Sequence, residues 1–366
     1  MMGHVNLSPN FLLDLEVQVI KVDMIREEKY MKKAISYLFT IVLIVATSRI
    51  ILSNINPAEI SYLLYRTNRY LLLTAVLCMV LYWIIDALII QAVSSKVGVK
   101  FSLRRSLKIT LIGQYYSEIT PYAVGCQPAQ IYTMMGYSVP AGKGTLIAIN
   151  KFVIYRIAFT VYMAMVFFLR HDFIYDVVRG SFSVIIIGLV LHMMSTSLFV
   201  ALFLNPKIVE KAVFYVLSFL HRIKIIKDMD TAKDKIMAYI REYSDSMDKI
   251  KGSHRLIFII FILSALQLSC YFAIGYFIFR GLSVNTISFT DVMTLQSMIY
   301  LIITVIPTPG TIGTSEAGFY LLFKRFVSPG IMPYATLLWS LINYYLNLIC
   351  GGIVTLVNHF MPPEKA

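Results

Sequence analysis

Charge is scarce in this sequence. Asp, Glu, Lys and Arg together make up 14% of its 366 residues, whereas hydrophobic residues make up 58%. A soluble protein cannot bury so large an apolar share and still cover its surface with charged groups. The composition therefore excludes an ordinary soluble domain and predicts an all-α polytopic membrane protein, in which lipid solvates the apolar surface.

Several kinds of functional motif are also missing. The four cysteines are far apart and include no CxxC pair, so they are interpreted as small residues that pack between helices: Cys78, Cys126, Cys270 and Cys350. The sequence contains no Walker A motif, so this chain is not expected to hydrolyse ATP, and no HExxH motif. No catalytic residue, metal ligand or cofactor site is assigned.

Positive charge is in excess, with a net charge of +13. The basic residues cluster in short segments beside apolar runs, which is the pattern that orients membrane proteins with their Lys and Arg residues in the cytoplasm. Anionic lipid headgroups are therefore the expected partners, and a nucleic-acid role is not predicted.

Six apolar runs are long enough to cross about 30 Å of hydrocarbon. The predicted spans are residues 34–55, 70–93, 144–169, 182–204, 255–280 and 333–359. Two further apolar regions, 109–135 and 290–327, are broken by Pro and Gly. Residues 1–30 carry mixed charge and are interpreted as a cytoplasmic extension, with Met31 as an alternative start.

The positions of the basic residues predict the topology. Lys and Arg gather before the first span, in 94–108 and in 205–255, so these segments and the N-terminus are expected in the cytoplasm. Two full spans separate 94–108 from 205–255. The broken region 109–135 must then leave and return on the cytoplasmic side, as a re-entrant hairpin.

The order span, span, broken hairpin, span now occurs twice. Because each unit makes an odd number of crossings, the second is predicted to be inverted relative to the first. The first repeat covers 31–169 with hairpin 109–135; the second covers 182–360 with a cytoplasmic insert, 205–254, and hairpin 290–327. Lys324 and Arg325 would lie near the outer face, which counts against this topology. If 290–312 crosses fully, the inversion fails.

The two breaks have similar chemistry. They read GQYYSEITPYAVGCQPAQIYTMMG and VIPTPGTIGTSEAGFYLLF. Broken backbone at membrane depth is tolerated only where it is buried in protein or lines a wet cavity. After the second break Thr314 or Ser315 is expected to cap a new helix, whose N-terminus can hold phosphate. Ordinary Pro-kinked spans are the alternative, but each break carries a carboxylate, Glu118 or Glu316, which favours a functional role.

The segments ITPYAVGCQPAQIY and PTPGTIGTSEAG resemble the two signature segments of the lysylphosphatidylglycerol synthetase transmembrane, or flippase-like, family. The resemblance covers about residues 31–360 and departs from the family pattern at Cys126, Gln130 and Thr311. It implies translocation of a phospholipid or lipid-linked headgroup between leaflets. The aminoacyl-transferase domain of bifunctional members would have to follow residue 360, so lipid aminoacylation is not expected of this chain.

Charges inside the spans need partners, because one at the bilayer centre costs at least ~2.5 kcal/mol. Asp86 and Lys151 lie at equal depth, so an ion pair between them is predicted. Arg156 lies about 18 Å above the cytoplasmic end of its span, beyond easy snorkelling. Its anion is Glu118 or Glu316 in a resting state, or a substrate phosphate; both alternatives are open. His192 stands alone in a span and is interpreted as a packing or hydrogen-bonded histidine.

Polar stripes on the last two spans favour a wet interior, with interhelical hydrogen bonding as the alternative. One stripe is Ser264, Gln267 and Tyr271; the other is Ser340, Asn343 and Asn347. The residues expected to contact a lipid headgroup come from the charges, the breaks and the last span: Arg156, Lys151, Glu118, Glu316, Thr120, Pro121, Gly125, Pro309, Gly310, Gly313, Asn343 and Asn347.

The function expected from these features is that of a lipid translocator in the plasma membrane, and not of an enzyme. A membrane-embedded lipid-modifying enzyme and a secondary transporter of a small solute remain alternatives. The expected partners are membrane lipids, with a homo-oligomer or a separate lipid-synthesising enzyme left open.

Overall fold

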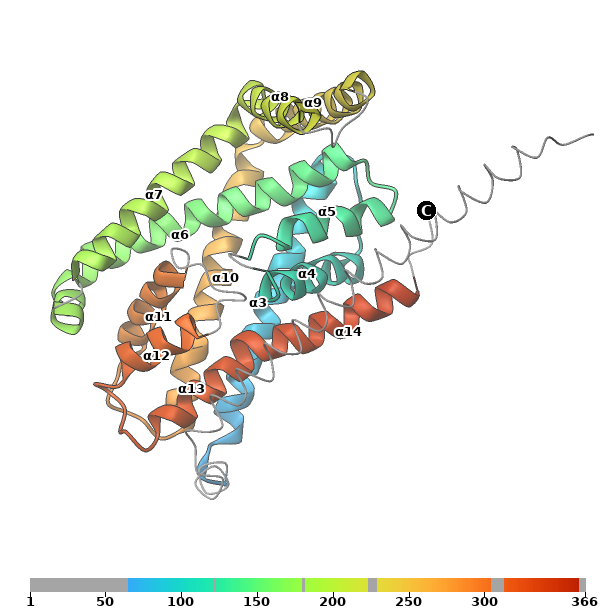
Figure 1. The fold of residues 1–366 in the computed structure, drawn as a ribbon. Helices are drawn as coiled ribbons and strands as arrows, with labels where there is room; N and C mark the ends of the chain where they lie inside the picture. The colour runs from blue at the N-terminus through green and yellow to red at the C-terminus, as the bar shows by residue number, and fades with distance from the viewer. Residues whose placement is uncertain (1–64, 121–122, 180–181, 223–228, 304–312, 362–366) are drawn as a thin grey trace, which may run out of the picture. The chain divides into compact units, whose positions relative to one another are not determined.

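The computed structural model describes residues 65–120, 123–179, 182–222, 229–303 and 313–361. The chain divides into two units, Met1–Asn54 and Ile55–Ala366, and all described residues belong to the second. The predicted extension 1–30 and the first predicted span, 34–55, lie outside the described residues. The described elements are all helices (Figure 1).

Within the described residues, five helices are long and apolar enough to cross a membrane. They are α3 (Arg69–Lys96), α6 (Ala141–Val178), α7 (Phe182–Leu204), α10 (His254–Gly281) and the last helix, Met332–Phe360. Each coincides with a predicted span, and α7 has the predicted bounds. Because a helix of about 20 residues spans 30 Å, the predicted multi-pass membrane protein is confirmed.

The last helix contains an irregularity that the sequence did not predict. It consists of α13 (Met332–Ser340), a π-helical segment η2 (Leu341–Tyr345) and α14 (Leu346–Phe360). A π segment carries an extra residue within the turn, and such segments are frequent at functional sites.

Both predicted breaks separate short helices. In the first, α4 (Leu103–Glu118) and α5 (Cys126–Gly136) pack against one another. In the second, α11 (Phe289–Ile303) packs against α12 (Thr314–Phe323). Both predicted breaks therefore fall between the ends of described helices.

The predicted cap of α12 is wrong by a residue. Gly313, not Thr314 or Ser315, precedes the helix, and its φ of +80° is a conformation that favours glycine. The Glu316 carboxylate accepts a hydrogen bond from the Gly313 N–H, so a side chain from within the first turn satisfies this backbone donor.

The insert 205–254 contains two amphipathic helices, α8 (Pro206–Arg222) and α9 (Met229–Lys251), which lie side by side (Figure 1). The Glu242 carboxylate on α9 accepts a hydrogen bond of 3.0 Å from the Gly142 N–H at the start of α6. The insert is therefore attached to the membrane helices through a helix end.

Two apolar clusters share the long helices, and polar residues separate them. On α3 one cluster ends at Trp83 and the other begins at Ile85. On α6 the division falls between Ile154 and Ala158, and on α10 between Ile260 and Leu268. Asp86, Arg156 and Gln267 lie at or beside these divisions, so a polar layer crosses the middle of the bundle.

Candidate functional site

The predicted ion pair between Asp86 and Lys151 is confirmed. Lys151 Nζ on α6 donates to both Asp86 carboxylate oxygens on α3, at 3.0 and 2.8 Å. Thr110 Oγ1 on α4 and Gln267 Nε2 on α10 donate to the same carboxylate at 2.8 and 3.1 Å. The Asp86 and Lys151 side chains are buried, so the pair ties four helices together in the interior.

Glu118, at the end of α4, has an amide as its partner. Asn347 Nδ2 on α14 donates to Glu118 Oε1 at 3.2 Å. Trp83 Nε1 on α3 donates to Asn347 Oδ1 at 2.7 Å, which fixes the orientation of the amide. Glu118 itself is half-buried and forms no ion pair within the part of the chain that the structure describes.

Glu316 is surrounded by neutral donors. Its carboxylate accepts from the Gly313 N–H at 2.6 Å, from Ser315 Oγ at 3.0 Å and from Ser340 Oγ on α13 at 3.1 Å. The side chain is buried, and its neutral donors can hold a carboxylate without a cation.

The polar stripe predicted on the last helix contacts both carboxylates. Ser340 lies just before η2 and reaches Glu316, whereas Asn347 lies just after it and reaches Glu118. Asn343, within η2, donates to the Trp339 carbonyl at 3.1 Å. All three residues are buried, so this helix links the two chain breaks.

Arg156 does not pair with either glutamate in the described part of the molecule, so the predicted resting pair is wrong. The guanidinium donates to Ser195 Oγ and Thr196 Oγ1 on α7, at 3.0 and 3.3 Å. It also lies over the rings of Phe152 and Phe199, 5.5 and 5.2 Å from their centroids. Arg156 is five positions after Lys151, which places it about 140° further round the α6 axis, toward α7.

His192 belongs to the same group, as a hydrogen-bonded histidine. Its Nδ1 lies 3.4 Å from Arg156 and its Nε2 lies 3.1 Å from Thr160 Oγ1. Substrate phosphate, the second predicted partner of Arg156, stays a prediction.

The turn after α4 depends on Thr120 and Gly125. Thr120 Oγ1 donates to the Tyr116 carbonyl at 2.6 Å and accepts from the Gly125 N–H at 2.9 Å. A Cβ at Gly125 would lie 2.7 Å from the Tyr116 carbonyl oxygen, so the turn needs glycine.

The second break uses its glycine differently. A Cβ at Gly313 would meet no described atom within 4 Å, so the positive φ, and not close packing, accounts for this glycine. The remaining candidate residues of the two breaks, Pro121, Pro309 and Gly310, lie outside the described residues.

Four tyrosines form a group of which the sequence analysis named only Tyr271. Tyr82 on α3 lies 5.7 Å from Tyr271 on α10, and Tyr271 lies 5.9 Å from Tyr300 on α11, between ring centroids. Tyr155 on α6 lies 6.4 Å from Tyr300. The spacing in the sequence could have revealed this group. Tyr82, Tyr155 and Tyr271 each lie four residues, about one helical turn, from a member of the Asp86 network: Asp86, Lys151 and Gln267 respectively. The high number of tyrosines, 24 in all, concealed it.

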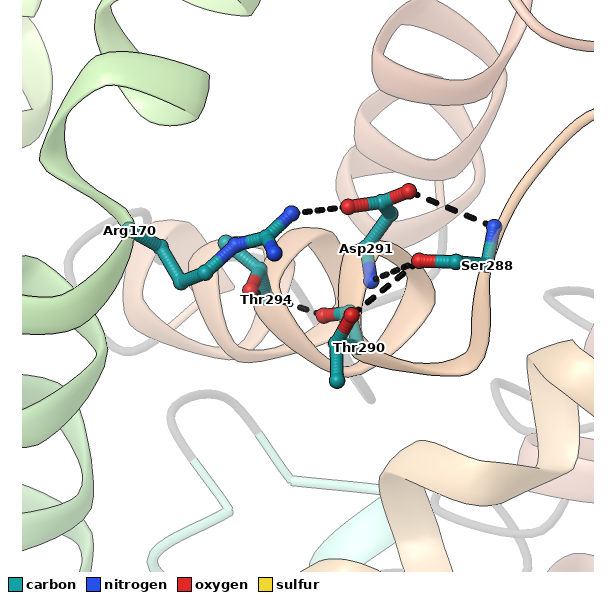
Figure 2. A network of polar contacts seen from close by, with 5 residues as sticks. All are labelled: Arg170, Ser288, Thr290, Asp291 and Thr294. Carbon is teal, nitrogen blue, oxygen red and sulfur yellow. Dashed lines mark hydrogen bonds and ion pairs between the residues drawn. The ribbon is translucent and has the colours of Figure 1, made fainter.

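A second polar network lies at the far end of α6 (Figure 2). Arg170, where α6 has a non-helical backbone, forms an ion pair with Asp291 at the start of α11. Asp291 also accepts from the Ser288 N–H, so it caps α11 as well as pairing with Arg170. Further along α6, Asp176 forms an ion pair of 2.8 Å with Arg325. Arg325 is one of the two basic residues that counted against the predicted topology, and it thus has an acidic partner.

Metal ligands are not grouped in the described segments: no three His, Cys, Asp or Glu side chains lie together there as a candidate metal site.

Comparison with known proteins places these features in a family context. Residues 33–351 match the family model described as "Lysylphosphatidylglycerol synthase TM region". The chain is also similar to a protein of Archaeoglobus fulgidus described as a UPF0104 membrane protein, with 23% identity over 294 residues. That alignment covers 79% of this chain and 86% of the relative.

Proposed function

The chain belongs to the lysylphosphatidylglycerol synthase TM region family, and from that premise we propose that it moves an anionic phospholipid or lipid-linked headgroup between membrane leaflets. In this proposal the protein is a translocator and not an enzyme. Its partners are membrane lipids, and its location is the plasma membrane.

The observation that carries the proposal is the polar layer between the two apolar clusters. Charged residues are costly inside a bilayer and mark substrate paths. Here they come from broken as well as continuous helices: Glu118 ends α4, Glu316 lies in the first turn of α12, and Arg156 has neutral partners. A polar headgroup can cross such a layer while its acyl chains remain in lipid.

The helix contacts support the proposed inverted repeat and re-entrant hairpins. In the first proposed repeat α3, α4, α5 and α6 touch in chain order, and α3 also touches α6. The same contacts recur among α10, α11, α12 and α13 in the second. Moreover, α4 packs on α14, the end of the second repeat, and α11 touches α6, the end of the first, less extensively. Such reciprocal contacts are expected for two repeats related by a pseudo-twofold axis.

An apolar cavity offers a place for an acyl chain. It has a volume of about 380 Å³ and lies between α6 and the start of α10. Its walls are Ile154, Ile157, His254, Ile257, Phe258 and Phe261. Because α10 follows the basic insert, the positive-inside rule favours the cytoplasmic leaflet for this cavity. We propose that the N-terminus, which also precedes a cluster of Lys and Arg, lies in the cytoplasm.

Reconstitution into vesicles tests the function. Purified protein in vesicles of phosphatidylcholine with labelled phosphatidylglycerol should speed the movement of label between leaflets, measured by chemical quenching of the outer label. Arg156→Met should slow the labelled anionic lipid more than labelled phosphatidylcholine, because the guanidinium can pair with phosphate. Lys251→Met, an exposed lysine at the end of α9, is the matched control and should keep wild-type rates.

Two results would contradict the proposal. One is a rate equal to that of protein-free vesicles for every lipid tested. The other is a change in the mass of the lipid after incubation, which would indicate a lipid-modifying enzyme.

A further inference from the structure

The two glutamates at the chain breaks have no cation within the described segments. Glu118 interacts with the Asn347 amide, and Glu316 with two hydroxyls and a backbone N–H. Neither carboxylate is part of an ion pair there, whereas Lys151 is already paired with Asp86. The cations of the polar layer therefore leave these two carboxylates unneutralised.

The two carboxylates contact the same buried helix: Ser340 donates to Glu316, and Asn347, two turns further on, donates to Glu118. Two like charges in an interior of low dielectric repel, and one bound proton relieves that repulsion.

The other titratable groups on the elements beside the pair are phenols and a thiol. Tyr344 and Tyr345 lie in η2, between Ser340 and Asn347, with their ring centroids 5.1 Å apart. Tyr271 lies on α10, Tyr115 on α4, and Cys126 begins α5 after the turn that follows Glu118. Phenols and thiols can donate hydrogen bonds to a carboxylate, but they do not neutralise its charge.

A buried acceptor between the carboxylates lacks a donor. Asn343 lies between Ser340 and Asn347 on the last helix, is 4% exposed, and its Oδ1 accepts no hydrogen bond from the described residues. A buried carbonyl oxygen without a donor costs about 1–3 kcal/mol. A protonated carboxyl group is a donor that an ionised one is not, so a proton at this site would supply what Asn343 lacks.

We propose that Glu118 and Glu316 form a proton-binding site, and that the proton is taken up and released as lipid is moved. A proton from water binds a carboxylate oxygen, and the resulting carboxylic acid donates to a neighbouring acceptor. Its release to water on the other side of the membrane restores the carboxylate. The coupling half of this proposal rests on the proposed function, whereas the binding half does not.

The only two tryptophans of the chain report on the site directly. Trp83 donates to Asn347, the partner of Glu118, and Trp339 stacks on Phe319 of α12, 4.8 Å between centroids. In lipid nanodiscs the tryptophan emission should change with pH in one titration step. Glu118→Gln and Glu316→Gln should each remove or shift that step, because an amide keeps the shape but cannot bind the proton.

Glu210→Gln, on α8, is the matched control and should leave the step unchanged. A wild-type emission that is constant across pH, or a step that persists unshifted in both site variants, would overturn proton binding. A step that moves with sodium concentration at constant pH would assign the site to a metal cation instead.

Coupling is measured separately, in vesicles that contain a pH-sensitive dye. A pH gradient should change the initial rate of lipid movement by wild-type protein, and Glu316→Gln should abolish that dependence. If lipid moves but ignores the gradient, coupling is excluded and the proposed function stands. If no lipid moves while the tryptophan step is present, the proposed function fails and proton binding stands.

Discussion

Lys151 and Arg156 are two cations on the same helix, five residues apart, and the protein treats them differently. Lys151 is buried against a carboxylate that three side chains hold from different helices. Arg156 is surrounded by hydroxyls, a histidine and two aromatic rings. The charge of Lys151 is neutralised by Asp86 and is not available to a ligand. The positive charge of Arg156 has only neutral partners and remains available. One is therefore suited to holding helices together and the other to binding an anion.

Breaking the paired charge should have the largest effect on stability. Asp86→Asn leaves the Lys151 ammonium buried without an anion, which should lower the free energy of unfolding by about 3–5 kcal/mol. Adding Lys151→Met should restore part of this loss, since the stranded charge is then gone. Thermal unfolding of the purified variants in one detergent measures both changes. Strictly additive losses would mean that the two residues do not act as a pair.

The glutamate in the second break should matter less to stability. Glu316→Gln keeps an oxygen that can accept from the Gly313 N–H but loses the favourable charge at the helix N-terminus, a cost of about 1 kcal/mol. The same unfolding measurement, with Glu210→Gln as reference, checks it. A loss as large as that of Asp86→Asn would reveal a buried cation beside Glu316 and remove the contrast between paired and unpaired charge.

Replacing Arg156, the cation without an anionic partner, should change the free energy of unfolding least. Arg156→Met replaces a half-buried charge that has no anion among the described residues with an apolar side chain of similar length, so the free energy of unfolding should stay within about 0.5 kcal/mol or rise. Arg170→Met is the comparison on the same helix, because it removes the partner of Asp291. If Arg156→Met proves the more damaging of the two, an anionic partner of Arg156 must exist.

Depth along a helix could be predicted from the sequence, and direction around it could not. Counting residues from the ends of the spans brought Asp86 to the level of Lys151, and the structure pairs them. The same counting indicated that Arg156 needs an anion, and a glutamate was one of the two predicted partners. That pairing was wrong because the Arg156 side chain points toward α7. Direction depends on which helices are neighbours, and hydropathy carries little of that information when a helix is apolar on all sides.

Glycine and proline marked both chain breaks, because few other residues end helices in an apolar run. The insert 205–254 was predicted, but its two amphipathic helices, α8 and α9, were not, because the charge of this segment was used only to orient the protein. The tyrosine group needed the Asp86 network first: only beside Asp86, Lys151 and Gln267 does a spacing of four residues stand out among 24 tyrosines.

Two of the contacts between helices α3–α6 and helices α10–α14 differ in strength. Along one, α14 passes so near α4 that a Cβ on Gly351 would collide with the Leu111 carbonyl oxygen, and the backbones are in direct contact. Along the other, α11 touches α6 less extensively, and the half-buried Arg170–Asp291 ion pair reinforces that contact. Ion pairs that solvent can reach are weakened by salt, whereas a backbone contact admits no solvent. High salt is therefore expected to loosen the contact at Arg170 and to leave the contact at Gly351 intact.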